Sequence, residues 1–123
     1  VLTMENQSND LSAKIRIHFF TTDKCFGPGI YELLENVRQY GSLRSAATSM
    51  NMAYSKAWKM VKLCEENLGF KPLISTTGGK NGGGAHVTAE ALRFMQAYDE
   101  YCYEIREFSD KLLKEKFNFY KNN

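Results

Sequence analysis

The sequence predicts a mostly α-helical fold with a small amount of β structure. Between Gly41 and Leu68, two short amphipathic segments separated by only a few residues predict a helix, a tight turn and a second helix. Two strand-like segments then flank a glycine-rich run at residues 77–84. A long amphipathic pattern from Ala89 to about Phe117 completes the chain. This order of elements is typical of a winged helix-turn-helix, and 123 residues favour a single domain, 1–123.

The N-terminal part is predicted to form a small hairpin and one helix. Residues 1–12 are polar and are expected to be flexible. Lys14–Phe20 alternates charged and apolar residues, which predicts a half-buried strand, and Cys25-Phe26 is its expected partner. Gly27-Pro28-Gly29 then opens a helix that should end at Gly41. The predicted buried stripe of that helix is Ile30, Leu33, Leu34, Val37 and Tyr40.

The two helices between Gly41 and Leu68 each have one apolar face. Ser42 is the predicted N-cap of the first helix, because its hydroxyl can accept a hydrogen bond from an unpaired backbone N–H. The second helix is expected to begin near Ala53. The residues predicted to be buried are Leu43, Ala46, Ala47 and Met50 in the first helix and Ala57, Val61, Cys64 and Leu68 in the second.

The exposed side of the second helix is predicted to be basic and polar. Ser55, Lys59 and Lys62 share this side, Lys56 lies on its flank, and the acidic residues come only in the later turns. A helix that enters the major groove of DNA needs cations for phosphates and short polar groups for base edges. The candidate DNA-binding residues are Ser42, Arg44, Tyr54, Ser55, Lys56, Lys59, Lys62, Lys80 and Asn81.

An ordinary antiparallel helix pair with solvated lysines explains the same pattern, and the following segment decides between the two. Pro72–Thr76 and residues 85–87 read as strands, and five glycines in residues 77–84 separate them. A strand, a loop and a strand directly after two such helices favour the winged fold. A nucleotide-binding phosphate loop is not supported, because Gly79-Lys80 is followed by Asn81 and not by Ser or Thr. Trp58 is expected to pack in the core under the wing.

The final helix is predicted to mediate dimerisation. Thr88 is its expected N-cap, and its apolar residues repeat at intervals of four and three residues, as in a coiled coil. The candidate dimer contacts are Phe94, Tyr98, Tyr101, Ile105, Phe108 and Leu112. The alternative is that this helix folds back over its own domain and that the protein is a monomer.

Composition limits the other functions. The net charge is only +2, but residues 43–87 carry six Lys/Arg and two acids, while residues 89–117 carry five Lys/Arg and seven acids. Three scattered cysteines suit structural thiols in a reducing, cytoplasmic setting. No metal-ligand motif, membrane span or catalytic group of residues is visible, so we predict no metal, no cofactor, no membrane partner and no enzyme activity. His18 and His86 are expected to be structural.

These residues resemble the N-terminal domain of the ModE-type, molybdate-dependent transcriptional regulators, a winged helix related to the LysR-type DNA-binding domain. The similar motifs extend over roughly Lys14 to Tyr98. They are Gly27-Pro28-Gly29, Gly41-Ser42, Ala46-Ala47, Ala57-Trp58, Pro72-Leu73, Thr77-Gly78-Gly79, Gly82-Gly83-Gly84 and Thr88. The resemblance implies DNA binding through the helix that carries Tyr54–Lys62 and through the wing, with dimerisation partly through the last helix.

The expected function is therefore transcriptional regulation by a homodimer bound to duplex DNA. Two recognition helices would enter successive major grooves about 34 Å apart on a near-palindromic site. Sensing members of the family carry C-terminal molybdate-binding domains, and a chain that ends at Asn123 is expected to have none, so the resemblance does not imply molybdate or other oxyanion sensing. The alternatives are a protein-interaction module that uses the aromatic final helix, and a regulator with an effector in its dimer interface.

Overall fold

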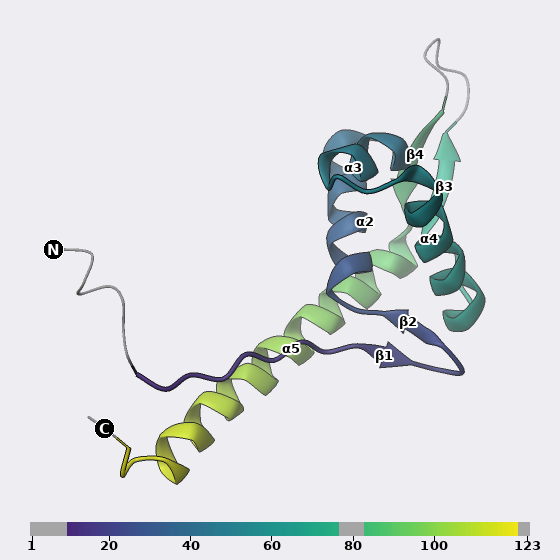
Figure 1. Cartoon of the computed structure of the whole chain (residues 1–123). Helices are drawn as coiled ribbons and strands as arrows, with labels where there is room; N and C mark the ends of the chain where they lie inside the picture. Colours follow the sequence, from purple (N-terminus) through teal and green to yellow (C-terminus); the bar gives the residue numbers. More distant parts are fainter. Residues whose placement is uncertain (1–9, 77–82, 121–123) are drawn as a thin grey trace, which may run out of the picture. The chain divides into compact units, whose positions relative to one another are not determined.

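The computed structural model describes residues 10–76 and 83–120 and contains four helices and two antiparallel hairpins in this range. The elements are β1 (Phe19–Phe20), β2 (Lys24–Phe26), α2 (Pro28–Tyr40), α3 (Leu43–Ser49), α4 (Tyr54–Leu68), β3 (Leu73–Thr76), β4 (Gly84–Val87) and α5 (Ala89–Lys116) (Figure 1). The predicted class, mostly helical with a small β component, is confirmed.

The chain divides into two compact units, and α5 contributes to both. The larger unit is Arg16–Tyr98. The smaller unit joins the two ends of the chain, and its described residues are 10–15 and 99–120.

A cluster of aromatic rings forms the centre of the larger unit. Phe26 of β2 is 1% exposed, and its ring centroid lies 4.7 Å from that of Phe94 and 5.0 Å from that of Tyr98, both on α5. Phe19 of β1 meets the same two rings edge-on, at 6.1 and 5.3 Å. Edge-to-face packing of this kind adds to the free energy gained by burying the rings. The hairpin and the first turns of α5 are therefore held to each other by direct ring contacts.

The strand predicted over Lys14–Phe20 is much shorter in the structure, because only Phe19–Phe20 pairs with β2. The partner strand has just three residues, so it offers no hydrogen bonds to the residues before Phe19. The carbonyl of Ile17 instead accepts a hydrogen bond from the Tyr98 hydroxyl at 2.7 Å. The predicted alternation of burial holds nevertheless: Ile17 and Phe19 are half-buried, whereas Arg16 is exposed.

Helix α2 begins at Pro28 and ends at Gly41, as predicted, and buries Ile30, Leu33, Leu34 and Val37. Gly41 adopts the left-handed conformation (φ 87°) that terminates many helices, and its N–H donates to the carbonyl of Val37. Tyr40, which was predicted to extend the buried stripe, is 50% exposed. It is the last residue of α2, and the chain changes direction at Gly41 immediately after it.

Helices α3 and α4 are joined by a four-residue turn. The Ser42 hydroxyl accepts a hydrogen bond from the Ser45 N–H at 3.0 Å, which confirms the predicted N-cap. In the turn, Asn51 has a positive φ of 53°, and the Met52 N–H donates to the carbonyl of Ala47 at 2.9 Å. Most of the predicted core positions are confirmed, because Ala46, Ala47, Ala57, Val61 and Cys64 are buried. Leu43, Met50 and Leu68, which were also predicted to be buried, are half-buried.

Strands β3 and β4 form an antiparallel hairpin that contacts the end of α2. Their register pairs Leu73 with Val87 and Thr76 with Gly84. The Ala85 N–H donates to the carbonyl of Gly41 at 2.9 Å. A Cβ atom on Gly84 would lie 3.1 Å from that carbonyl oxygen and 2.7 Å from Thr76 Oγ1, so the close approach requires glycine. Lys80 and Asn81 lie outside the described residues.

Thr88 connects the hairpin to α5. Its hydroxyl donates to the carbonyl of Lys71 at 2.6 Å and accepts from the N–H of Ala91 at 3.1 Å. The predicted N-cap is therefore confirmed, and the same side chain also fixes the residues that precede β3. Thr88 is buried, so water has little access to its hydroxyl and cannot readily replace either hydrogen bond.

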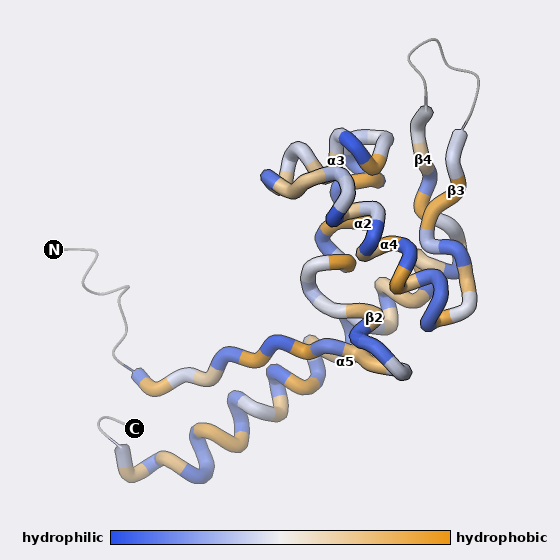
Figure 2. Tube along the Cα trace, turned by 45° about the vertical axis from the view of Figure 1, so that its right-hand side comes forward, coloured by the Kyte–Doolittle hydropathy of each residue, from blue (hydrophilic) through white to orange (hydrophobic). Residues whose placement is uncertain are grey.

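In the smaller unit, residues 10–15 run in an extended conformation together with the C-terminal part of α5. Leu11 lies with Leu113 and Phe117 around a shallow hollow. Cys102 is buried, but large apolar residues stay exposed on the same helix, among them Phe108 at 60%. Figure 2 shows apolar and polar residues alternating along α5. This part of the helix keeps an uncovered apolar side.

We expect Thr88→Val to destabilise the protein by about 1–2 kcal/mol, since it removes both hydrogen bonds of a buried hydroxyl. Thr88→Ser keeps the hydroxyl and should lose less. Urea unfolding followed by circular dichroism measures both variants. Equal stability of the valine variant and the wild type would contradict the role of this side chain.

Stability should also fall at alkaline pH. Burial, with smaller contributions from Cys25 and Glu65, raises the pKa of the Cys64 thiol from 9.0 to about 12. Above pH 9 the unfolded chain loses this proton while the folded protein keeps it. The free energy of unfolding should therefore decrease as pH rises from about 9 towards 12, by up to about 1.4 kcal/mol per pH unit.

The matched comparison for this effect is Cys64→Ala. All other ionisable groups are the same in both proteins, so the difference between them isolates the thiol. Urea unfolding between pH 8 and pH 10.5 should show a steeper decline in the wild type. Parallel declines would contradict the assignment.

Candidate nucleic-acid interface

The candidate site is the exposed side of α4. Ala57, Val61 and Cys64 point into the core, which places Tyr54, Ser55, Lys56 and Lys59 in solvent and Lys62 at a half-buried position. Residues 54–62 include three lysines and no acidic residue. The first acidic side chain along the helix, Glu65, forms an ion pair with Lys71 at 3.5 Å. Among the described residues, the three lysines in the first half of α4 therefore form no ion pair.

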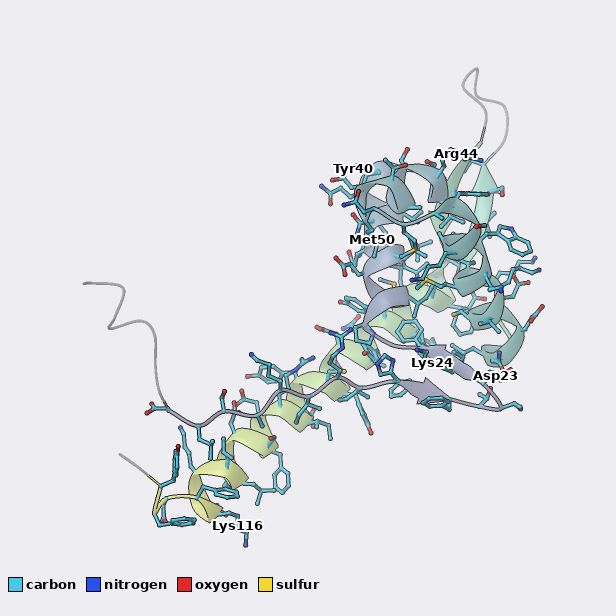
Figure 3. All side chains as sticks on the ribbon, in the orientation of Figure 1. Asp23, Lys24, Tyr40, Arg44, Met50 and Lys116 are labelled. Carbon is cyan, nitrogen blue, oxygen red and sulfur yellow. The ribbon has the colours of Figure 1, made fainter. Side chains whose placement is uncertain are left out.

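Arg44 links α3 to the start of α4. Its guanidinium carbon lies 4.1 Å from the centroid of the Tyr54 ring, a cation–π contact between the two helices. Figure 3 shows the position of Arg44 on α3. Stacking on the ring leaves the N–H groups at the edge of the guanidinium available to an acceptor. The structure therefore brings these two predicted residues together across the turn.

Ser42 has a structural role that limits its part in the site. Its hydroxyl oxygen accepts the Ser45 N–H, so the hydroxyl is held at the first turn of α3. The hydroxyl hydrogen can still be donated to an anion. Ser42 is thus placed beside Arg44 but is not freely mobile.

Trp58 does not occupy the position expected from the sequence. It is 50% exposed and not packed in the core. The core side of this helix is filled by Ala57 and Val61, and Trp58 is rotated about 100° away from Ala57. The Lys62 ammonium lies 5.5 Å from the centroid of the indole ring.

An exposed tryptophan beside these lysines is part of the candidate surface, and the sequence contained a signal for it. Tyr54, Trp58 and Lys62 are spaced at i, i+4 and i+8, so they follow one line along the helix. With Arg44 over Tyr54 and Lys62 over Trp58, cations and aromatic rings alternate along this line.

The β3–β4 hairpin follows α4 in the chain, and its side chains are partly exposed. Ile74 and His86 are cross-strand partners, and both are exposed. The predicted contacts Lys80 and Asn81 belong to residues 77–82, which the structure does not describe.

The predicted dimer contacts fall into two groups. Phe94 and Tyr98 pack against Phe19 and Phe26 inside the larger unit, so their rings are already used by their own chain. The other residues belong to the smaller unit. Tyr101, Ile105 and Phe108 are exposed, and Leu112 is half-buried.

Residues 10–76 and 83–120 lack the features of two further kinds of site. This part of the chain contains no group of three or more His, Cys, Asp or Glu side chains placed to hold a metal ion. None of its helices combines the length and the apolar run that a bilayer crossing requires.

Comparison with known proteins finds several transcriptional regulators. The regulator ModE of Haemophilus influenzae is 37% identical over 73 residues, covering 58% of this chain and 28% of the relative. ModE of Yersinia pestis is 37% identical over 71 residues, covering 54% and 26%. The DNA-binding transcriptional dual regulator ModE of Escherichia coli is 29% identical over 90 residues, covering 72% and 34%.

This chain thus spans between a quarter and about a third of the length of these relatives. No family model matches the sequence. The similarity lies in the N-terminal part of this chain, which is 29–37% identical to transcriptional regulators named ModE.

Proposed function

We propose that this protein is a transcriptional regulator that binds duplex DNA through a winged helix-turn-helix. The observation that carries the proposal is the exposed side of α4, where Lys56, Lys59 and Lys62 form no ion pair with a carboxylate of the described residues. Relatives named as transcriptional regulators support the same function.

In the proposed complex, α4 is the recognition helix. Its exposed N-terminal half supplies Ser55 for base edges or phosphates and the three lysines for the phosphate backbone. Arg44 binds a phosphate while its guanidinium remains stacked on Tyr54. A planar guanidinium suits a phosphate because it can donate two parallel hydrogen bonds. Trp58 joins this surface as an apolar contact to the sugar-phosphate backbone.

The β3–β4 hairpin is the proposed wing. It is attached to the helical part of the unit by the hydrogen bond from Ala85 to Gly41 and by Thr88 at its base. These bonds hold the hairpin in a defined position on the unit that carries α4. Lys80 and Asn81, at the tip in the sequence, are the proposed wing contacts with the DNA backbone.

The proposed active form is a homodimer. Tyr101, Ile105 and Phe108 leave a large apolar area exposed on α5, and a second copy of the same helix is the simplest cover for it. Leu112 continues the same spacing. Phe94 and Tyr98 are left out of the proposed interface, because they pack within their own chain. A dimer would bind a near-palindromic site.

A protein-interaction module is the second candidate, and the same exposed aromatic side chains favour it. In that case α5 would bind a different protein, and α4 would not need its basic side. The two candidates differ in whether the larger unit selects a DNA sequence.

Selection of binding sites from a random duplex pool at two salt concentrations should recover a near-palindromic motif that persists at the higher salt. On that duplex, we expect Lys56→Ala and Lys59→Ala each to weaken binding. Each should also reduce the slope of log K against log salt concentration by about 0.9, as one phosphate contact is lost. Fluorescence anisotropy of a labelled duplex measures both quantities.

The control is Lys111→Ala, which removes an exposed lysine from α5. It should leave the affinity and the slope unchanged. An unchanged slope in both α4 variants would refute the phosphate contacts. Retention of duplexes without any motif, and only at low salt, would refute sequence-specific regulation and favour the interaction module.

We expect Phe108→Glu to shift the protein from dimer to monomer, because it places a carboxylate in the proposed apolar interface. Sedimentation equilibrium across a range of concentrations measures the association. Arg106→Glu introduces the same group on another side of α5 and should leave the dimer intact. A wild type that stays monomeric at all concentrations would contradict the proposed interface.

A further inference from the structure

A hollow of about 310 Å³ lies in the larger unit, beside the flank of α4 that carries Lys56. It is enclosed by the residues before β1, by β2, by the first turn of α2 and by the side of α4 that carries Lys56 and Met60. Its volume falls within the range of sites for small organic molecules.

Four basic side chains surround this hollow. Arg16 and His18 come from the segment leading into β1, Lys24 from β2 and Lys56 from α4. No Asp or Glu is among the described residues that line it, and Asp23, next to Lys24 in the sequence, is not part of the lining. Like charges that converge from three elements repel one another unless an anion lies between them. The rim therefore favours a negatively charged group.

The inner wall of the hollow is apolar. Phe26, Ile30, Met60 and Leu63 line it, and Phe26 and Ile30 are buried. A fully hydrated inorganic anion would gain nothing from these side chains. A molecule with an apolar part next to its charge would bury that part here, with a gain that grows with the area removed from water.

Two glycines make the shape of this hollow possible. A Cβ atom on Gly27 would lie 2.5 Å from Nδ1 of His18, so a side chain there would push the imidazole out of place. A Cβ atom on Gly29 would lie 3.3 Å from the terminal methyl of Met60. The Gly-Pro-Gly sequence thus allows the basic rim and the apolar wall to approach the same stretch of backbone.

We propose that this hollow binds a small organic anion, in which an aromatic or aliphatic body carries a phosphate or carboxylate group. The apolar body lies against Phe26, Ile30 and Met60. The charged group lies among Arg16, Lys24 and Lys56. Because the hollow offers both basic side chains and an apolar wall, it should bind this ligand more tightly than a simple inorganic oxyanion.

Through Lys56, such a ligand would regulate DNA binding. The same ammonium is a proposed phosphate contact on DNA, so a bound anion would compete with the duplex for it. This consequence rests on the proposed function, whereas binding of the anion does not. The first titrations are therefore carried out without DNA.

The probe is phenyl phosphate, titrated into ¹⁵N-labelled protein and followed by the amide resonances of Lys24, Gly27 and Gly29. Inorganic phosphate supplies the charge alone, and benzyl alcohol supplies the apolar body alone. We expect saturable shifts with phenyl phosphate and an affinity about tenfold higher than that of either partial probe. Equal affinity for inorganic phosphate, or shifts that do not saturate, would overturn the proposal.

Lys24→Gln should weaken phenyl phosphate binding about fivefold, the scale of a single exposed charge pair. Lys24 is exposed and outside the proposed DNA contacts, so the variant should fold normally. Lys111→Gln, on α5, is the matched control and should bind like the wild type. Equal affinities for all three proteins would overturn the site.

A last titration tests whether the hollow binds a small molecule or a phosphate of DNA. A short duplex is titrated into the wild type under the same conditions. If the duplex moves the Lys24, Gly27 and Gly29 resonances and phenyl phosphate does not, the hollow is a clamp for a DNA phosphate and the proposal fails. Failure of the duplex to bind, together with saturable phenyl phosphate binding, would leave this site intact and refute the proposed function instead.

Discussion

The packing of aromatic rings around Phe26 is the interaction on which the larger unit depends. Phe26 lies on a strand of three residues, which could not persist as an isolated hairpin in water. Its contacts with Phe94 and Tyr98 hold that strand against α5, and Phe19 covers the same rings from β1. These contacts join segments about 70 residues apart in the chain. The rings therefore fix the N-terminal hairpin to α5 and also fill the centre of the unit.

This arrangement determines what α4 can present. Helix α2 begins directly after Phe26, and the small residues Ala46, Ala47 and Ala57 let α3 and α4 pack closely with it. Because Ala57, Val61 and Cys64 face the core, the helical period places Lys56 and Lys59 in solvent and Lys62 at a half-buried position. All three lysines belong to the proposed DNA surface, and Lys56 also lines the hollow beside β2. One helix thus supplies both the proposed interface and the proposed anion site.

The smaller unit has a different character. Its described residues bury Cys102, yet several aromatic side chains of α5 stay in solvent. The repeat of apolar residues along this helix changes its surroundings partway. Its first two members, Phe94 and Tyr98, pack in the core of the larger unit, whereas the later ones are exposed or half-buried. A regular repeat in the sequence does not reveal where the change occurs.

The sequence by itself determined the order and the ends of most helices, since these depend on local chemistry: Ser42 and Thr88 as caps, Gly41 as a left-handed end, and the 3.6-residue period of the apolar faces. It also indicated the basic side of α4. Only the tertiary structure decided what depends on distant partners. The strand before Phe20 stops where β2 has no more residues to pair with, and Trp58 is exposed because Ala57 and Val61 already fill the core. The hollow among Arg16, Lys24 and Lys56 exists only because packing brings three separate segments together, and no local pattern contains that information.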